Sequence, residues 1–289
     1  MSAPSHATPW QARLPDRSPV ALTVMRLTDD PDASAIDLAQ AIGADAVFTA
    51  RILRVANSPY YGLAGGVSSL LFAVSVLGFH TIKALAVVAA TGLDSPAAAP
   101  TRFWQAAATT ACASEHVAPI LGADRGDAFC LGLLHTLGAA VLHQQQPLPR
   151  LCLPLPADYA DVARAEDDLY GICHDQAGAQ LLESWQFPQH ITTLIARHHE
   201  PLLPDASPLE RTLHVARTLT HRLLTEDSST DPDGDGDSRT GGDDGVNAKA
   251  PSIAWLTQGR LSDEDTHPLL SRLRESTPHL LESLQPGSS

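Results

Sequence analysis

Residues 166–201 read EDDLYGICHDQAGAQLLESWQFPQHITTLIARHHEP, with the spacing of two consecutive helices. His174 opens the first helix, and positions i+4, i+7, i+8 and i+11 on its inward face are Gly178, Leu181, Leu182 and Trp185. Pro188 begins the second helix, which ends at His198-His199-Glu200-Pro201. We therefore expect both helices to point histidines into one helical core.

A fourth histidine lies upstream. His135 stands in GLLHTLG, residues 132–138, on a helix that we expect from Asp127 to about His143. Imidazoles from separate helices can converge in a bundle and bind a metal ion. A hydrolytic metal centre also needs carboxylate oxygens, whereas the residue after His135 is Thr136, whose hydroxyl is a poor anionic ligand. Asp175 lies one position off the inward face, so we expect its side chain to point elsewhere.

The N-terminal part indicates a bundle of about five short helices. Residues 34–62 read SAIDLAQAIGADAVFTARILRVANSPYYG, and residues 67–85 read VSSLLFAVSVLGFHTIKAL. Asn57 and Ser58 precede Pro59, and we expect them to bond backbone groups freed at a helix end. Gly78 should separate two helices, with His80 near the interface of two bundles.

In this order, the motifs resemble the HDOD family, a branch of the HD phosphohydrolase superfamily found in bacterial signalling proteins. The resemblance rests on NS followed by YG, on LLHxxG, on HxxxG with a downstream WxxP, and on HHxP, and it covers most of the chain. It implies an all-α fold of two packed helical bundles, the second like that of HD phosphohydrolases. The residues that match family motifs are Asn57, Ser58, Gly78, His135, Gly138, His174, Gly178, Trp185, His198 and His199.

The same resemblance implies that metal-binding relatives use an earlier histidine and a late aspartate. The matching stretches here are FWQAAATTA (103–111) and LHVARTLTHRL (213–223), which lack that histidine and that aspartate. We therefore expect no metal and no catalytic residues, with the histidines joining helices through hydrogen bonds. If a metal is bound, its ligands are expected to be His135, His174, His198 and His199.

Two functions remain open. The first is a non-catalytic module of bacterial signal transduction that binds a partner protein or, alternatively, a small nucleotide in the cleft between its bundles. The second is a metal-dependent phosphohydrolase with the incomplete set of histidine ligands. Metal content after purification distinguishes the two.

Composition and helical spacing divide the chain into five predicted regions. We expect a flexible arm at 1–17, the N-terminal bundle at 18–94, the HD-like bundle at 95–225, an acidic disordered insertion at 226–250, and closing helices with a tail at 251–289. The insertion has eight acidic residues between 226 and 245. Its DPDGDGD, residues 231–237, resembles a calcium loop, but Gly242 stands where an EF-hand has glutamate.

Charge and hydropathy limit the kinds of molecule that the protein can bind. A net charge of −14 argues against nucleic acid and anionic membranes as partners. Residues 70–93 are strongly apolar, but Gly78, His80, Thr81 and Lys83 interrupt them, which favours two buried helices over a membrane span. The four cysteines form no CxxC and are expected to be reduced. Without a signal peptide at the N-terminus, we expect a cytoplasmic protein without a cofactor.

Overall fold

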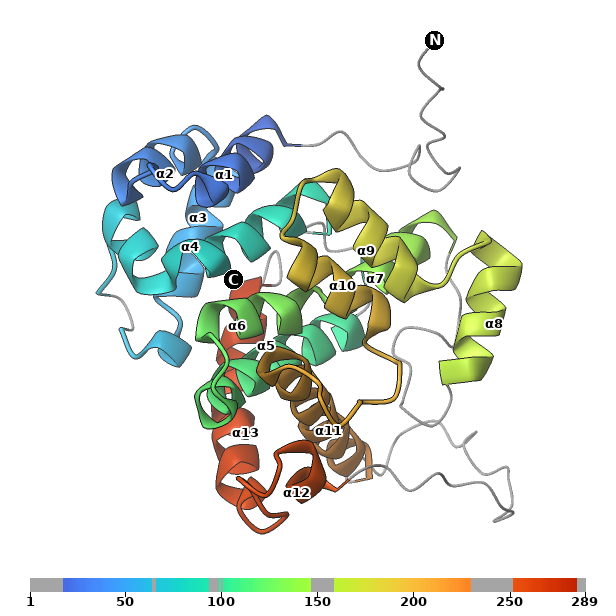
Figure 1. Cartoon of the computed structure of the whole chain (residues 1–289). Coiled ribbons are helices and arrows are strands. Elements are labelled where there is room, and N and C mark those ends of the chain that lie inside the picture. Colours follow the sequence, from blue (N-terminus) through green and yellow to red (C-terminus); the bar gives the residue numbers. More distant parts are fainter. Residues whose placement is uncertain are drawn as a thin grey trace.

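The computed structural model describes residues 18–63, 66–93, 99, 101–146, 159–229 and 252–284. Regular secondary structure in these residues is entirely helical, as predicted (Figure 1). The predicted arm at 1–17 and residues 230–250 of the predicted insertion lie outside the described residues, whereas residues 226–229 of that insertion continue a helix.

The first group of helices contains α1 (Pro19–Asp29), α2 (Ala35–Ile42), α3 (Ala46–Ala56), the 3-10 turn η2 (Pro59–Tyr61) and α4 (Leu70–Ala90). Ser34 and Asp37 form a capping box at the start of α2, and the Asp45 carboxylate caps α3. Gly78 interrupts α4 with φ 74°, a left-handed value that favours glycine. The predicted pair of helices joined at Gly78 is therefore present.

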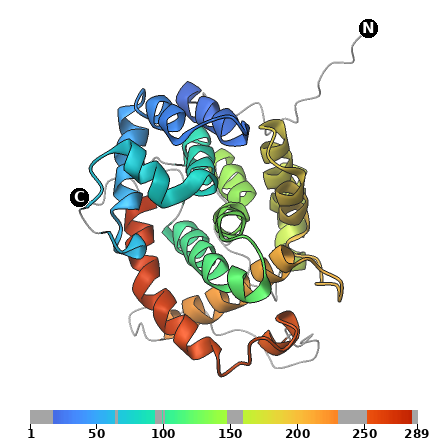
Figure 2. The same ribbon diagram turned by 60° about the vertical axis from the view of Figure 1, so that its left-hand side comes forward.

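The second group contains α5 (Thr101–Leu121), α6 (Arg125–Leu134), α7 (Leu137–Gln145), α8 (Tyr159–Tyr170), α9 (His174–Ser184), α10 (Gln189–Arg197) and α11 (Pro208–Ser229). Helix α6 lies at the centre, where it contacts α4, α5, α10 and α11 (Figure 2). All of its residues from Ala128 to Leu134 are buried. This central helix leads directly to the first of the four histidines.

The expected single helix from Asp127 to about His143 is wrong. Helix α6 ends at Leu134, and α7 begins only at Leu137, so His135 and Thr136 form a break between two helices. Thr136 has φ −100° and ψ 9°, outside helical values. The hydrophobic spacing continues through the break, which is why the sequence pattern did not reveal it.

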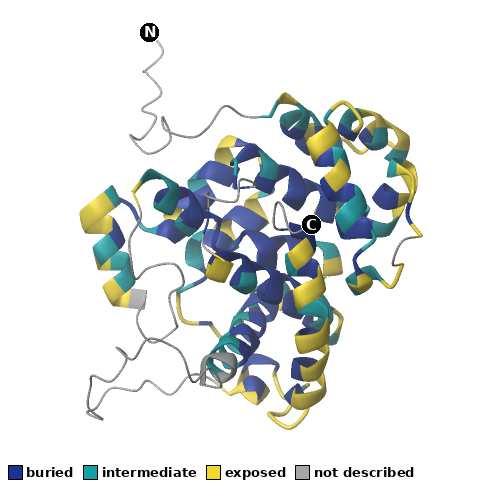
Figure 3. Cartoon of the chain, turned by 180° about the vertical axis from the view of Figure 1, so that it is seen from behind, coloured by how far each residue is buried: buried dark blue, intermediate teal, exposed yellow. Residues whose placement is uncertain are grey.

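The last helices close the fold. The short α12 (Ile253–Leu256) precedes α13 (Thr266–Leu284), which packs on α5 and α11 and also on α3 and η2. The C-terminal helix α13 therefore contacts both groups of helices. The view from behind shows that the buried side of α13 faces the interior of the protein (Figure 3). The buried apolar side chains form one core that runs from α1 to α13.

Among the described residues, two stretches are long and apolar enough to cross a membrane, Leu70–Ala90 and Arg125–Gln145. Within the protein, 61% and 83% of their apolar windows are buried. Their hydrophobicity is therefore explained by burial in the helical core.

Candidate functional site

Two glycines position the histidine-bearing helices. A Cβ on Gly138 of α7 would lie 1.9 Å from the carbonyl oxygen of His174, so only glycine fits at this contact. A Cβ on Gly178 of α9 would in turn lie 3.1 Å from the Gly138 nitrogen. The two glycines let α7 and α9 approach backbone to backbone, and this brings His174 beside the break that holds His135.

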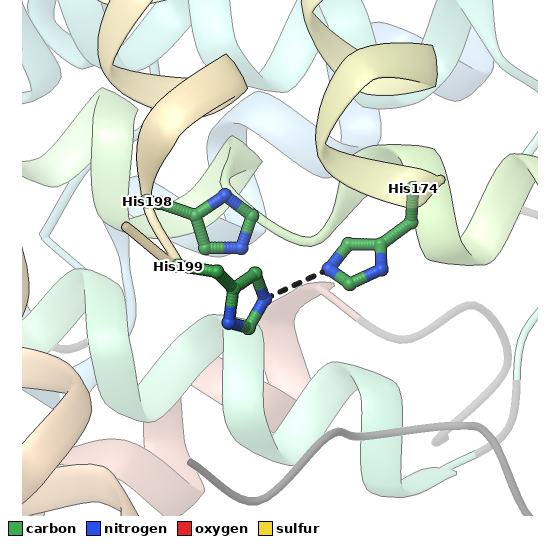
Figure 4. A group of neighbouring side chains, drawn as sticks. All are labelled: His174, His198 and His199. Carbon is green, nitrogen blue, oxygen red and sulfur yellow. Dashed lines mark hydrogen bonds between the residues drawn. The ribbon is translucent and has the colours of Figure 1, made fainter. Parts of the chain in front are cut away.

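The four predicted histidines gather at this place. His198 is central, because its ring centroid is 5.4 Å from that of His135, 5.4 Å from that of His174 and 4.1 Å from that of His199. One nitrogen each of His174, His198 and His199 lies within 4.8 Å of the others (Figure 4). His135 is outside this set of three. We call the four residues the histidine cluster.

His174 is held by a buried carboxylate. Its Nδ1 lies 2.8 Å from Oε2 of Glu166 on α8, and its backbone N–H donates to the same oxygen at 2.8 Å. Glu166 is 2% exposed, and His174 is fully buried. A carboxylate can only accept, so Nδ1 of His174 carries the proton and Nε2 presents a lone pair.

At the other end of the histidine cluster, an arginine contacts His199. Nη2 of Arg217 on α11 lies 2.9 Å from Nδ1 of His199, and Nη1 donates to the His198 carbonyl oxygen. A guanidinium can only donate, so Nδ1 of His199 accepts and its Nε2 carries the proton. That Nε2 lies 3.0 Å from Nε2 of His174, to which it donates (dashed in Figure 4).

These bonds form one continuous chain, Arg217–His199–His174–Glu166. Its direction is fixed by the cation that donates at one end and the carboxylate that accepts at the other. Both imidazoles are neutral, and the charges at the two ends cancel. We call this chain the arginine–glutamate relay.

Burial keeps the other histidines neutral as well. It lowers the pKa of His135 to about 3, and the positive charge of Arg217 acts in the same direction. Burial, followed by the neighbouring His199 and Arg217, holds the pKa of His198 well below 6.5. The Nδ1 atoms of these rings lie 2.8 Å from the Gly132 carbonyl oxygen and 2.6 Å from the Ile195 carbonyl oxygen, respectively.

Part of this geometry suits a metal ion. Carbonyl oxygens and Glu166 hold the Nδ1 protons of His135, His198 and His174, which leaves their Nε2 atoms as lone-pair donors. The buried Nε2 of His198 has no hydrogen-bond partner among the described residues. These are the tautomers that metal-binding imidazoles adopt.

The charges do not suit a metal ion. The set of three nearby donors contains no carboxylate, and Glu166 is bound to the far nitrogen of His174. If His199 bound a metal through Nε2, its proton would have to move to Nδ1, where it would face the N–H of Arg217. A dication would also add two charges to a group that is already neutral, at a large desolvation cost. The neighbouring arginine and the lack of a carboxylate among the three donors therefore disfavour a hydrolytic metal centre in the histidine cluster.

The remaining motif residues have structural positions. Asn57 ends α3, and its amide group donates to the carbonyls of Leu53 and Val67 and accepts from Val67 N–H. The Ser58 hydroxyl accepts from Tyr60 N–H at the start of η2. Trp185 is buried at the end of α9. Asp175 is buried on α9, outside the set of three histidines.

Neither end of the relay was predicted from the sequence. Glu166 lies four residues after Val162 and four before Tyr170, on the inward side of α8. That placement of a carboxylate was a usable signal. Arg217 lies in residues 213–223, the stretch that lacks the family's late aspartate. No local pattern predicts that α11 brings it against the end of α10.

A known protein family shares this architecture. The model of the HDOD domain matches residues 14–201, more than half of the chain. The chain belongs to the HDOD domain family. The family match ends at residue 201, two residues after His199, so Arg217 lies beyond it.

Similar structures share the fold of this HDOD domain. "Putative phosphohydrolase" from Shewanella amazonensis SB2B is 23% identical, with a TM-score of 0.63 over 94% of this chain and 96% of that one. "Putative signal transduction protein" from Marinobacter aquaeolei VT8 is 25% identical, with a TM-score of 0.61 over 95% of this chain and 60% of that one. An HDOD domain protein with unknown function from Geobacter sulfurreducens is 21% identical, with a TM-score of 0.59 over 94% and 92%.

A curated sequence relative is less informative about function. It is an uncharacterized protein of Treponema pallidum (strain Nichols), 24% identical over an alignment of 216 positions that covers 70% of this chain. The match covers 41% of that relative, so the present chain corresponds to less than half of its length.

Proposed function

We propose that this chain is a non-catalytic regulatory module of bacterial signal transduction that acts in the cytoplasm by binding a partner protein. The observation that carries the proposal is the arginine–glutamate relay. Arg217 supplies the positive charge of the histidine cluster, and Glu166 balances it without a metal ion or cofactor. The regulatory role is supported by the membership of this chain in the HDOD domain family and by its likeness to a structure named for signal transduction.

Exposed apolar side chains support a protein partner over a small nucleotide. In the part of the chain that the structure describes, five of the eight large hydrophobic residues with substantial exposure belong to the first group of helices or its loop: Ile36, Val47, Leu63, Leu71 and Phe72. Exposed apolar surface is a mark of interaction sites. A small nucleotide bound between the bundles is the alternative ligand, and the pocket at their interface is lined by Lys83 and His80 among others.

The second candidate function is a metal-dependent phosphohydrolase. The unpartnered Nε2 of His198 favours it, as do the tautomers of His135 and His174. In that case the metal would displace Arg217 and activate a water molecule.

Metal analysis and a hydrolysis assay test the proposal together. The protein is purified without chelator or added metal, and its iron, manganese and zinc are measured. Hydrolysis of bis-p-nitrophenyl phosphate is then followed with and without manganese. We expect a metal content that His198→Ala leaves unchanged, no hydrolysis above the buffer rate, and a response of the melting curve to EDTA that is the same in His198→Ala as in the unmodified protein. Hydrolysis that is lost in both His135→Ala and His198→Ala would establish the second function instead.

A further inference from the structure

A second group of metal-binding side chains lies away from the histidine cluster. His80 on α4, Asp124 immediately before α6, and Asp127 on α6 each offer a ligand atom within 4.8 Å of the others. Asp127 joins a fourth residue to them, because its Oδ1 is 2.8 Å from Nδ1 of His80 and its Oδ2 is 3.5 Å from Nε2 of His190 on α10. Three helices thus converge on one carboxylate.

Glycines create the room for this convergence. A Cβ on Gly126 would lie 3.0 Å from Cβ and 3.1 Å from Cγ of His80, and 3.2 Å from Oδ1 of Asp124. The absence of a side chain at Gly126 lets the His80 imidazole lie against the first turn of α6. Gly78, with φ 74°, turns the chain two residues before His80 and so directs this histidine toward α6.

The group is accessible, and its charge suits a dication. The side chains of His80 and His190 are 57% and 55% exposed, and that of Asp127 is 25% exposed. His80 and Asp127 also line a pocket between the two groups of helices, which leaves space for an ion and its water ligands. The nearby cation Lys83 is held by Asp29 and by the ring of Phe187, 4.2 Å from its Nζ.

We propose that His80, Asp124, Asp127 and His190 form a divalent transition-metal site that ties α4 to α6 and α10. Two imidazoles and two carboxylates match the ligand preference of Zn²⁺, whereas Mg²⁺ and Ca²⁺ prefer oxygen ligands alone. The two carboxylates neutralise the ion, in contrast to the histidine cluster. Because α4 belongs to the first group of helices and α6 and α10 to the second, bound metal stabilises their packing.

Isothermal titration with zinc chloride and thermal unfolding with and without zinc test this site. We expect one zinc ion per chain and a melting temperature that rises with zinc and returns to the metal-free value with EDTA. His80→Ala and His190→Ala should each weaken zinc binding by about tenfold or more. His279→Ala is the matched control, because His279 is an exposed histidine on α13, and it should bind zinc as the unmodified protein does.

A further variant keeps every ligand in place. Gly126→Ala introduces only a methyl group against His80 and Asp124, so it should weaken zinc binding while the fold stays intact. Zinc binding that is unchanged in His80→Ala but lost in His198→Ala would place the ion in the histidine cluster and overturn the proposal. No binding of zinc up to about 1 mM by the unmodified protein would overturn it as well.

Discussion

Nη2 of Arg217 lies 2.9 Å from Nδ1 of His199, and this contact fixes which nitrogens of His199 and His174 carry the protons. A guanidinium does not lose its proton at physiological pH, so His199 must accept there and donate to His174. Glu166 then accepts a hydrogen bond from the Nδ1–H of His174. The relay links α8, α9, α10 and α11 through groups that are buried or half-buried.

Arg217→Ala should lower the free energy of unfolding by about 3 kcal/mol, because the change leaves Glu166 as a buried charge without its counterion. Urea unfolding followed by circular dichroism measures the change. Arg222→Ala is the matched control on the same helix, since Arg222 pairs with Asp263 at the surface, 2.8 Å away. It should cost less than about 1 kcal/mol. Equal losses of unfolding free energy in the two variants would show that the relay stabilises the fold no more than a surface ion pair does.

Glu166→Gln tests the acidic end of the relay. A glutamine oxygen can still accept one bond from His174, but the charge that balances Arg217 is lost, so we expect a loss of roughly 1–3 kcal/mol in unfolding free energy. Glu183→Gln on α9, where the side chain is exposed, should change stability by less than about 0.5 kcal/mol. A Glu166→Gln protein as stable as this control would contradict the buried pairing of Glu166 with His174.

Gly138→Ala should be among the most damaging small substitutions in the chain. The added Cβ would lie 1.9 Å from the His174 carbonyl oxygen, so α7 and α9 must separate. We expect a loss of about 3 kcal/mol or more, measured by thermal and urea unfolding. Gly43→Ala is the control, because its Cβ would lie 3.2 Å from the nearest atom and its φ of −62° suits alanine. A stable Gly138→Ala protein would contradict the close contact of α7 with α9.

Acid should destabilise the protein through its buried histidines. Burial lowers the pKa of His135 to about 3 and that of His198 well below 6.5, whereas both residues titrate near 6.5 in the unfolded chain. Below pH 6.5 the unfolded chain therefore takes up protons that the folded chain excludes, and each histidine lowers the unfolding free energy by about 1.4 kcal/mol per pH unit.

Urea unfolding at pH 7.5, 6.0 and 5.0 measures this dependence. In His135→Ala the unfolding free energy should depend less steeply on pH below pH 6.5, because the contribution of one buried histidine is missing. The same variant should be less stable at pH 7.5 by roughly 1–3 kcal/mol, since its truncation leaves the Gly132 carbonyl without its donor. A stability that does not change between pH 7.5 and 5.0 would show that the imidazoles are accessible to protons in the fold.

The sequence allowed much of the fold to be predicted, for physical reasons that differ between elements. Helices α9 and α10 were expected because their apolar residues recur at helical spacing and because Pro188 and Pro201 mark their limits. Asn57 and Gly78 were correctly expected at helix interruptions, since their chemistry is local. The break at His135 and Thr136 was not expected, because the apolar pattern passes through it unchanged.

The candidate site could be predicted only in part. The motifs identified the four histidines, and the structure brings all four together, with three close enough to share one ion. Arg217 could not be predicted, because its role depends on how α11 crosses the end of α10, far from any local signal. The group around Asp127 was missed for the same reason, since His80 and His190 come from separate helices.

The protonation state of His199 tests the central claim most directly. Long-range ¹H–¹⁵N correlation spectra of the uniformly ¹⁵N-labelled protein at neutral pH distinguish protonated from unprotonated imidazole nitrogens, and His199→Gln assigns the ring. The relay predicts a neutral His199 with its proton on Nε2 and a neutral His174 with its proton on Nδ1. A proton on Nδ1 of His199, or a signal from that ring that shifts when EDTA is added, would contradict the account and restore metal binding to the histidine cluster.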